Sequence, residues 1–225
     1  MNNKKTVSIE GKKFFCSWSG GKDSCLAFYR AVKMGGSPSF IFTMLDESGK
    51  RSRSHALPRK IFEEQAQSIG IKCLFRSATW EGYEKAFISG LRELKKNKVK
   101  IGVFGDIDLQ EHLDWVQTTC AKEGFMAVEP LWKNKRKKLL NEFINAGFKA
   151  RIIAVNTKKM SKKFLGKMIT KKLILELEKS GIDPSGENGE YHTVVTDGPI
   201  FRKPIKLKKL GIKNCGQYSF LKVTL

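Results

Sequence analysis

The chain of 225 residues is poor in acids, has three histidines and contains no long apolar run. Its five cysteines form no Cys-x-x-Cys pair and no cluster with histidine, and their number is odd, so neither a disulfide framework nor a zinc site is supported. No stretch reaches the ~18 consecutive apolar residues of a membrane-spanning helix, and the N-terminal segment MNNKKTVSIEGKK has no apolar centre typical of a secretion signal. We therefore expect a soluble, cytoplasmic protein with reduced thiols and no membrane partner.

Acids are outnumbered about two to one, with 43 Lys+Arg against 22 Asp+Glu and a formal net charge of +21. A charge of this size attracts nucleic acid, a nucleotide or an acidic protein surface. The excess is concentrated between residues 133 and 179, where fifteen Lys and Arg face three acids and alternate with Leu, Ile and Phe. This composition predicts a second region with basic amphipathic helices.

Hydrophobic residues make up 40% of the chain, enough for one large core or two smaller ones. In the first half, short apolar runs alternate with helical patterns, and the expected strands are FFCSW (14–18), SFIFTML (39–45), IKCLF (71–75) and KIGVFGDI (100–107). Strands separated by helices need crossover connections. We therefore expect an α/β fold with a mostly parallel sheet and helices on both faces over 1–129.

The second half has a different texture. Strand-like runs are FKARIIAVN (148–156), YHTVV (191–195) and QYSFLKVTL (217–225), and basic helical patterns lie between the first two. These runs predict a smaller C-terminal α/β (α+β) domain over 130–225. The sequence shows no internal repeat and no segment of low complexity.

The run SGGKDS (19–24) stands between an expected strand and an expected helix. In such a turn, Gly20 and Gly21 let backbone amides approach an anion closely, and the first turn of the helix adds further amides. Lys22 adds a positive charge. The run differs from the common P-loop, because Cys16 stands at the position of its first glycine. The alternative is a turn that only opens a helix.

A second constellation is GENGEYHT (186–193), which places two carboxylates, an amide, a phenol and an imidazole on a glycine-hinged loop. Glutamates and a tyrosine ring suit a cationic polar substrate. The alternative, from composition alone, is a solvated hairpin with ordinary caps.

The two runs, together with VFGDI (103–107), HLDW (112–115) and PLW (130–132), resemble the diphthine-ammonia ligase family, a branch of the ATP pyrophosphatase superfamily. The resemblance extends from about residue 14 to about residue 205. It implies a HUP-type nucleotide-binding domain over 1–129, followed by a family-specific substrate domain over 130–225 that carries GENGEYHT.

Two positions depart from the family pattern. The loop RSRSHALP (51–58) stands where archaeal and eukaryotic members have a SYM-type segment, and it is similar to bacterial homologues. Ser185 stands where cysteine is expected in many members.

The resemblance implies an AMP-forming ligase that makes a carbon–nitrogen bond. An acceptor carboxylate attacks the α-phosphorus of ATP, pyrophosphate leaves into SGGKDS, and ammonia then displaces AMP. The implied cofactors are ATP and Mg²⁺, and the implied partners are ammonia and an acceptor acid. That acceptor is diphthine on elongation factor 2 if the organism makes diphthamide, and an unidentified acid otherwise. A homodimer is compatible with the family.

Site residues follow from these motifs and from the strand ends. The nucleotide site is assigned to Trp18, Ser19, Gly20, Gly21, Lys22, Asp23, Ser24, Thr43, Met44, His55, Gly105 and Asp106. The acceptor and ammonia site is assigned to Glu187, Asn188, Gly189, Glu190, Tyr191, His192 and Thr193.

Catalytic roles are expected for four of these residues. Lys22 supplies a cation, Ser24 donates to the pyrophosphate, Asp23 binds Mg²⁺, and Glu190 holds ammonium and removes its proton.

Several of these residues have a purely structural alternative. Asp106 could cap the next helix, Thr43 and Met44 could belong to the core, and His55 could be an exposed loop residue. His112 and Trp115 are expected on a structural helix face and not in the site.

Two other functions fit parts of the sequence. The basic region 133–179 suits an ATP-dependent enzyme that modifies tRNA, but RNA is the less favoured partner because thiolating relatives commonly use paired cysteines. The third reading is a non-enzymatic module that a nucleotide switches.

Overall fold

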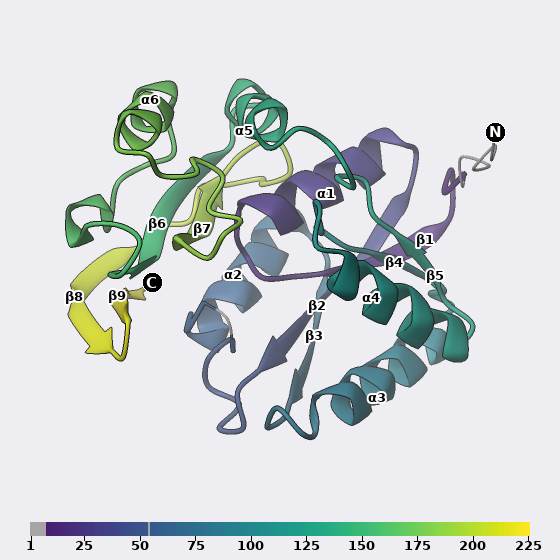
Figure 1. The fold of residues 1–225 in the computed structure, drawn as a ribbon. Helices are drawn as coiled ribbons and strands as arrows, with labels where there is room; N and C mark the ends of the chain where they lie inside the picture. Colours follow the sequence, from purple (N-terminus) through teal and green to yellow (C-terminus); the bar gives the residue numbers. More distant parts are fainter. Residues whose placement is uncertain (1–7, 54) are drawn as a thin grey trace.

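The computed structural model describes residues 8–53 and 55–225, arranged as two sheets with helices around them (Figure 1). Part of the N-terminal segment discussed above, residues 1–7, and Ser54 of the loop 51–58 lie outside the described residues. Within the described ranges, no helix has the length and apolar content needed to cross a bilayer.

The first sheet has five parallel strands in the order β3-β2-β1-β4-β5. The strands are β1 (Lys13–Ser17), β2 (Ser37–Leu45), β3 (Lys72–Ser77), β4 (Ile101–Val103) and β5 (Met126–Val128). The crossover helices are α1 (Lys22–Lys33), α2 (Arg59–Ile69), α3 (Tyr83–Lys96) and α4 (Gln110–Lys122). The predicted parallel sheet with helices on both faces is confirmed. The expected strand 100–107 is shorter than predicted, because the chain leaves the sheet after Val103.

Adjacent residues of β1 point to opposite faces of this sheet, as the pleat requires. Phe14 and Cys16 belong to the core cluster shared with α1 and α2, whereas Phe15 belongs to the cluster under α3 and α4. A strand buried on both faces reads as a continuous apolar run, which is why FFCSW shows no alternation.

The second sheet is antiparallel, with the order β7-β6-β9-β8. Its strands are β6 (Lys149–Asn156), β7 (Tyr191–Asp197), β8 (Lys208–Cys215) and β9 (Tyr218–Thr224). Three of them correspond to predicted strands. Strand β8 was not predicted, because this edge strand is exposed along its whole length and has only two apolar residues at alternate positions, Leu210 and Ile212.

The basic region forms two helices, α5 (Arg136–Asn145) and α6 (Lys171–Lys179), and a short 3-10 turn, η1 (Lys162–Phe164). Each helix buries a narrow apolar stripe and exposes most of its lysines; the buried residues are Leu139, Leu140 and Phe143 in α5 and Leu173, Ile174 and Leu177 in α6. The predicted amphipathic pattern is therefore confirmed.

One apolar core joins the two sheets. The cluster that contains Phe14 and Phe62 continues to Ile152 of β6 and Val194 of β7, so α1 lies between the sheets (Figure 1). In the first sheet the chain runs outward from β1 to β3 and then returns to β4 on the other side of β1. Ligands of open parallel sheets bind at such a reversal, outside the carboxyl ends of the strands.

Candidate nucleotide and acceptor site

The loop between β1 and α1 is compressed against two neighbouring elements. Gly20 has φ +72°, and a Cβ there would lie 2.7 Å from Oε1 of Gln65 on α2. At Gly21, a Cβ would lie 3.0 Å from Cε1 of His55 and 3.1 Å from the carbonyl oxygen of Thr193 on β7. Both positions therefore require glycine, the first for its backbone angle and both for space.

Two serine hydroxyls stabilise the curve of this loop. The amide of Gly21 donates to Oγ of Ser19 at 3.3 Å, and Oγ of Ser24 donates to the carbonyl oxygen of Gly21 at 3.1 Å. The two hydroxyl oxygens lie 3.1 Å apart. They stand at the amino end of α1, where unpaired amides and the helix dipole favour an anion.

The GENGEYHT segment is attached directly to this loop through β7. The amide of Lys22 donates to Oγ1 of Thr193 at 3.0 Å, and the amide of Val195 donates to the carbonyl oxygen of Gly20 at 2.9 Å. Gln65 joins them, since its Nε2 donates to both Gly20 O and Val195 O, at 3.2 and 2.9 Å. Trp18 supports the same glutamine, with Nε1 2.8 Å from its Oε1. The two sequence motifs therefore form one site.

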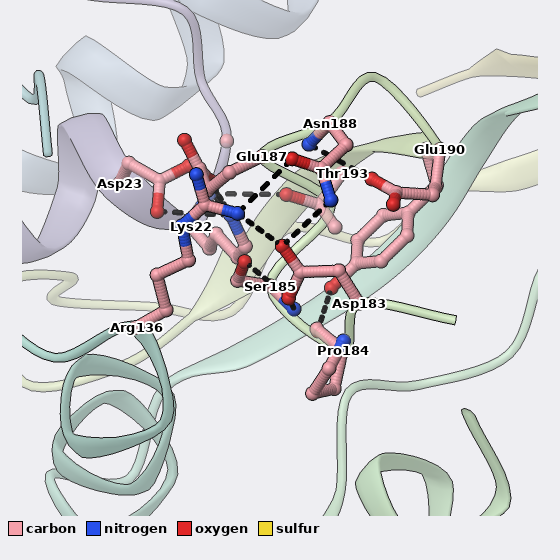
Figure 2. Close-up of polar contacts among 12 residues, drawn as sticks. Lys22, Asp23, Arg136, Asp183, Pro184, Ser185, Glu187, Asn188, Glu190 and Thr193 are labelled. Atoms are coloured by element: carbon pink, nitrogen blue, oxygen red, sulfur yellow. Dashed lines mark hydrogen bonds and ion pairs between the residues drawn. The ribbon is translucent and has the colours of Figure 1, made fainter. Parts of the chain in front are cut away.

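Lys22 lies at the centre of that site. Its Nζ is 2.8 Å from Oδ2 of Asp23 and 3.0 Å from Oε1 of Glu187, although only 8% of the lysine side chain is exposed (Figure 2). It also lies over the ring of Tyr191, 5.9 Å from the centroid. Burial lowers the pKa of Lys22, but the two carboxylates outweigh burial, so the pKa is raised above its ordinary value and the ammonium stays charged. Burial raises the pKa of Glu187, and the ammonium of Lys22 opposes this rise.

The other glutamate of the loop is turned away from the lysine. Glu190 is buried, and its Oε2 accepts a hydrogen bond from the amide of Asn188 at 3.0 Å (Figure 2). It is absent from the lining of the cavity into which Glu187 and Tyr191 project. The predicted role of Glu190 in deprotonating ammonium stays a prediction, and the geometry places Glu187 in the better position for it.

Arg136, the first residue of α5, joins the loop before β7 to the loop before α4. Its Nε and Nη2 donate to Asp108, at 2.7 and 3.0 Å, and its Nη1 donates to Asp183 at 2.5 Å and to Asn188 at 3.2 Å. Asp183 also accepts from Oγ of the buried Ser185 at 2.7 Å. Ser185 therefore has a structural role.

A pair of histidines lies where the loop before α1 meets the second sheet. The rings of His55 and His192 lie 4.6 Å apart, and Nδ1 of His55 lies 2.9 Å from the carbonyl oxygen of Ser19, to which it donates. Burial lowers the pKa of His55 to about 3, with a further contribution from His192. Burial and the charge of Lys22 lower the pKa of His192 to about 4. Both rings are therefore neutral near pH 7, and His55 is a half-buried part of the site.

The remaining nucleotide-site residues divide between the loop and the ends of the strands. Oγ1 of Thr43 donates to the carbonyl oxygen of Trp18 at 2.8 Å, which gives this threonine a structural role. A Cβ on Gly105 would lie 3.0 Å from the backbone carbon of Asp23, so glycine allows the chain after β4 to approach α1. Oδ1 of Asp106 lies 3.4 Å from Nδ1 of His112. The helix-capping alternative for Asp106 is wrong, because α4 has Leu109 at its N-cap and no side-chain cap.

Three adjoining cavities surround these residues. The first, of about 380 Å³, lies outside the ends of β1, β2 and β4 and is mostly aromatic; its walls include Met44, Arg53, Trp80, Tyr83, Phe87, Phe104, Asp106, His112 and Trp115. The second, of about 150 Å³, shares Ser17, Met44 and Tyr83 with the first and is also lined by Ser19 and His55. The third, of about 210 Å³, shares His55 with the second and contains Lys22, Asp23, Glu187, Gly189, Tyr191, His192 and Thr193.

The sequence predicts that His112 and Trp115 lie on a structural helix face and not in the site; the structure places them beside the site. Both line the aromatic cavity, because α4 begins directly beyond the carboxyl end of β4. Arg53, Trp80 and Tyr83 were missed. The guanidinium of Arg53 stacks on Trp80 at 4.7 Å, and its buried Nε has no hydrogen-bond partner among the described residues. The sequence feature that could have identified them is the position of Trp80 and Tyr83 just after a parallel strand.

A Mg²⁺ site is compatible with the chemistry of these residues. Within the described ranges, no group of three or more His, Cys, Asp and Glu side chains could hold a metal ion alone. Mg²⁺ usually takes one or two protein carboxylates together with substrate phosphates and water. Asp23 and Glu187 carry two negative charges against the single charge of Lys22, which leaves an excess for a divalent cation.

A parallel sheet with a glycine-serine loop at the amino end of its first helix, and an aromatic cavity beside that loop, is an arrangement typical of nucleotide-binding α/β domains. The model of the diphthamide synthase N-terminal domain matches residues 12–127, and the model of the diphthamide synthase C-terminal domain matches residues 135–224. The chain belongs to the diphthamide synthase family, and the predicted HUP-type α/β fold is confirmed.

Curated relatives carry the name diphthine–ammonia ligase. The protein of Schizosaccharomyces pombe is 26% identical over 229 residues, which cover 91% of this chain and 38% of that protein. The mouse protein is 34% identical over 131 residues, covering 56% of this chain and 49% of its own. The human protein is 26% identical over 214 residues, covering 83% and 79%. The chain thus spans well under two thirds of the first two relatives. The similarity of its loop 51–58 to bacterial homologues stays a prediction.

Proposed function

We propose that this protein is an ATP-dependent, AMP-forming ligase that adenylates an acceptor carboxylate, releases pyrophosphate and forms an amide with ammonia. The observation that carries the proposal is the position of Lys22, which lies between Asp23 of the phosphate loop and Glu187 of the acceptor loop. One ammonium thus contacts both the residues that would hold the leaving group and those that would hold the acceptor. The name of the curated relatives supports the same reaction.

The nucleotide is proposed to occupy the first two cavities. The aromatic walls of the 380 Å³ cavity suit a purine ring, and the buried Nε of Arg53 is a donor available to a ligand there. From this cavity, Ser17, Met44 and Tyr83 lead to the phosphate loop. This placement makes residues 1–129 the nucleotide-binding domain and residues 130–225 the acceptor domain.

The phosphate loop would stabilise the departing pyrophosphate. Amides at the start of α1 and the hydroxyls of Ser19 and Ser24 are already oriented by hydrogen bonds, so little reorganisation is needed when charge develops. Lys22 would neutralise part of that charge. Asp23, with Glu187 near it, would hold Mg²⁺, which supplies further charge neutralisation on the phosphates when bound.

The third cavity is proposed to hold the reacting carboxylate and ammonia. Glu187 faces into this cavity next to Lys22 and beside the ring of Tyr191. A carboxylate in this position can bind ammonium and accept a proton from it, which yields the ammonia that attacks the acyl-adenylate carbonyl and displaces AMP. The acceptor is diphthine on elongation factor 2 if the organism makes diphthamide, and another carboxylic acid if it does not.

The proposed reaction is tested by its nucleotide products. The full-length protein is incubated with ATP labelled at the α-phosphate, MgCl₂, an ammonium salt and a panel of carboxylic acids that includes diphthine on elongation factor 2. The expected products are AMP and pyrophosphate, formed only with a suitable acceptor. Replacing ammonium by hydroxylamine should yield an acyl hydroxamate. Formation of ADP and orthophosphate would contradict the proposal.

A further inference from the structure

A fourth cavity, of about 340 Å³, lies between the loop before α2 and the β8–β9 hairpin. Its lining includes Arg51, His55, Leu57, Lys213, Phe220 and Lys222. We call this hollow the hairpin cleft. The proposed path of ATP through the aromatic cavity and the phosphate loop does not use it.

The hairpin cleft is cationic over an apolar floor. Arg51, Lys213 and Lys222 are exposed at its walls, whereas Leu57 and Val223 are buried beneath them. None of the described residues that line it is acidic. Within the described ranges, neither Lys213 nor Lys222 forms an ion pair or a hydrogen bond through its ammonium. Their charges are therefore available to an anion from solution.

The cleft is connected to the reaction cavity. His55 lines both, so the two cavities adjoin at this ring. The second sheet makes the same connection, because His192, Ala154, Phe220 and Lys213 stand in register across its four strands. Three strand spacings of about 4.8 Å separate the first and last of them, which is about 14 Å.

Aromatic rings lie beside this row of residues across the second sheet. The ring of Tyr218 lies 6.3 Å from His192 and 6.0 Å from Phe220. The cavity beside Lys22 and the hairpin cleft differ in charge. Lys22 is neutralised by Asp23 and Glu187, whereas Lys213 and Lys222 in the cleft carry uncompensated positive charge. An elongated ligand with a negative group at its far end fits this arrangement.

We propose that the hairpin cleft binds a second anionic group of the acceptor, a carboxylate or a phosphate, while the carboxylate that reacts lies beside Lys22. This inference rests on the proposed ligase function, because it concerns the acceptor of that reaction. It narrows the substrate class to acids with two negative groups separated by roughly three strand spacings, about 14 Å.

Cys215 provides a reporter for occupancy of the cleft. It is exposed and lines the cleft, whereas Cys16, Cys25 and Cys120 are buried. The full-length protein is saturated with α,β-methylene ATP and alkylated with neutral iodoacetamide, and mass spectrometry gives the rate at Cys215. The probes are linear dicarboxylates from glutarate to dodecanedioate, phosphonocarboxylates of the same lengths, and the monomethyl ester of each dicarboxylate, all at one ionic strength.

We expect the longer dianions to slow alkylation of Cys215 and their monoesters to leave it unchanged. The two dianion series distinguish a carboxylate from a phosphate as the preferred group. Equal protection by diacid and monoester would overturn the proposal. Protection by a tRNA mixture at physiological salt, with none by the small dianions, would also overturn it in favour of a nucleic-acid acceptor.

Charge reversal identifies the groups responsible. Lys213→Glu and Lys222→Glu should each weaken protection by a long dianion about tenfold. The matched control is Lys209→Glu on the same strand, because the ammonium of Lys209 lies near Gly166 and outside the cleft. All three variants should bind α,β-methylene ATP as the wild type does, which also shows that they are folded. Unchanged protection in both cleft variants would refute the assignment.

Failure of this inference is distinguishable from failure of the proposed function. The alkylation experiment needs no turnover, and the release of AMP and pyrophosphate is measured separately. An enzyme that releases AMP and pyrophosphate with a monoacid acceptor, and is insensitive to Lys213→Glu, keeps the ligase function and loses the hairpin cleft.

Discussion

Nζ of Lys22 lies 3.0 Å from Oε1 of Glu187, although the two residues are 165 positions apart in the chain (Figure 2). The lysine is the first residue of α1, and the glutamate belongs to the loop that precedes β7. The contact is part-buried, so it is less screened by solvent than a fully exposed ion pair. Under the proposed function, a change at the leaving-group end of the site would therefore be felt directly at the acceptor end.

The first prediction separates the two glutamates of the acceptor loop. Glu187→Gln removes the carboxylate that faces Lys22, and amide formation should fall by about a hundredfold or more, in the range typical of general acid–base groups. Glu190→Gln replaces a buried side chain that bonds the amide of Asn188, and it should retain most of this activity. The measurement is hydroxamate formation at saturating ATP. The opposite order of the two variants would return the catalytic role to Glu190.

The second prediction concerns the phosphate loop. Ser24→Ala removes the hydroxyl that contacts Ser19 and Gly21, and Asp23→Ala removes the carboxylate nearest to Lys22. Each should lower acceptor-dependent exchange of pyrophosphate into ATP by about a hundred- to a thousandfold. Ser48→Ala, in an exposed turn, is the control. Full exchange activity in either loop variant would show that the pyrophosphate binds elsewhere.

The third prediction concerns binding of the nucleotide. Arg53→Met keeps the length of the side chain but removes the buried Nε and the guanidinium that stacks on Trp80. The dissociation constant of α,β-methylene ATP, measured by calorimetry, should rise about tenfold. Arg59→Met, which loses an exposed ion pair with Glu63 and a guanidinium that stacks on Phe75 outside the aromatic cavity, should bind like the wild type. Equal affinities for all three proteins would move the nucleotide out of the aromatic cavity.

The fourth prediction concerns pH. Burial lowers the pKa of His55 to about 3 and that of His192 to about 4, from 6.5. The unfolded chain therefore binds more protons than the native chain between these values, so stability is complete above pH 6.5 and falls as the pH decreases toward 4. Each histidine contributes at most about 1.4 kcal/mol per pH unit to this fall.

Urea denaturation at pH 7.5 and pH 5 measures this effect. The loss of unfolding free energy between the two pH values should be smaller in His192→Asn than in the wild type. His112→Asn is the control with the opposite sign, because the hydrogen bond to Asp106 raises the pKa of His112. A raised pKa contributes stability that is present at low pH and lost as the pH rises through it. An identical pH dependence in His192→Asn and the wild type would show that the ring is not buried in solution.

Most of the first domain was predictable from local pattern. Apolar runs such as FFCSW, each followed by a helical period, predicted the strands and their parallel direction. Strands joined through a helix need a crossover connection, which makes neighbouring strands parallel. The edge strand β8 was not predictable, because its pairing with β9 depends on a hairpin and not on burial of its own side chains.

The site was predictable in part. Glycines and serines in SGGKDS predicted a tight turn at the amino end of a helix, and this turn is present before α1, because it depends on consecutive residues. Its binding of pyrophosphate stays a prediction. The aromatic cavity was not predicted, since Trp80, Tyr83 and Trp115 come from separate connections that meet only at the carboxyl edge of the sheet.

Local order along the chain determined the fold class and the glycine-serine turn before α1. These features depend on backbone angles and hydrophobic periods that neighbouring residues set. Only the tertiary structure decided which glutamate faces Lys22, that His55 packs on His192, and that Lys213 stands in register with His192 across the second sheet. The reason is that such contacts join residues from different elements, and their distances depend on how two sheets pack on a common core.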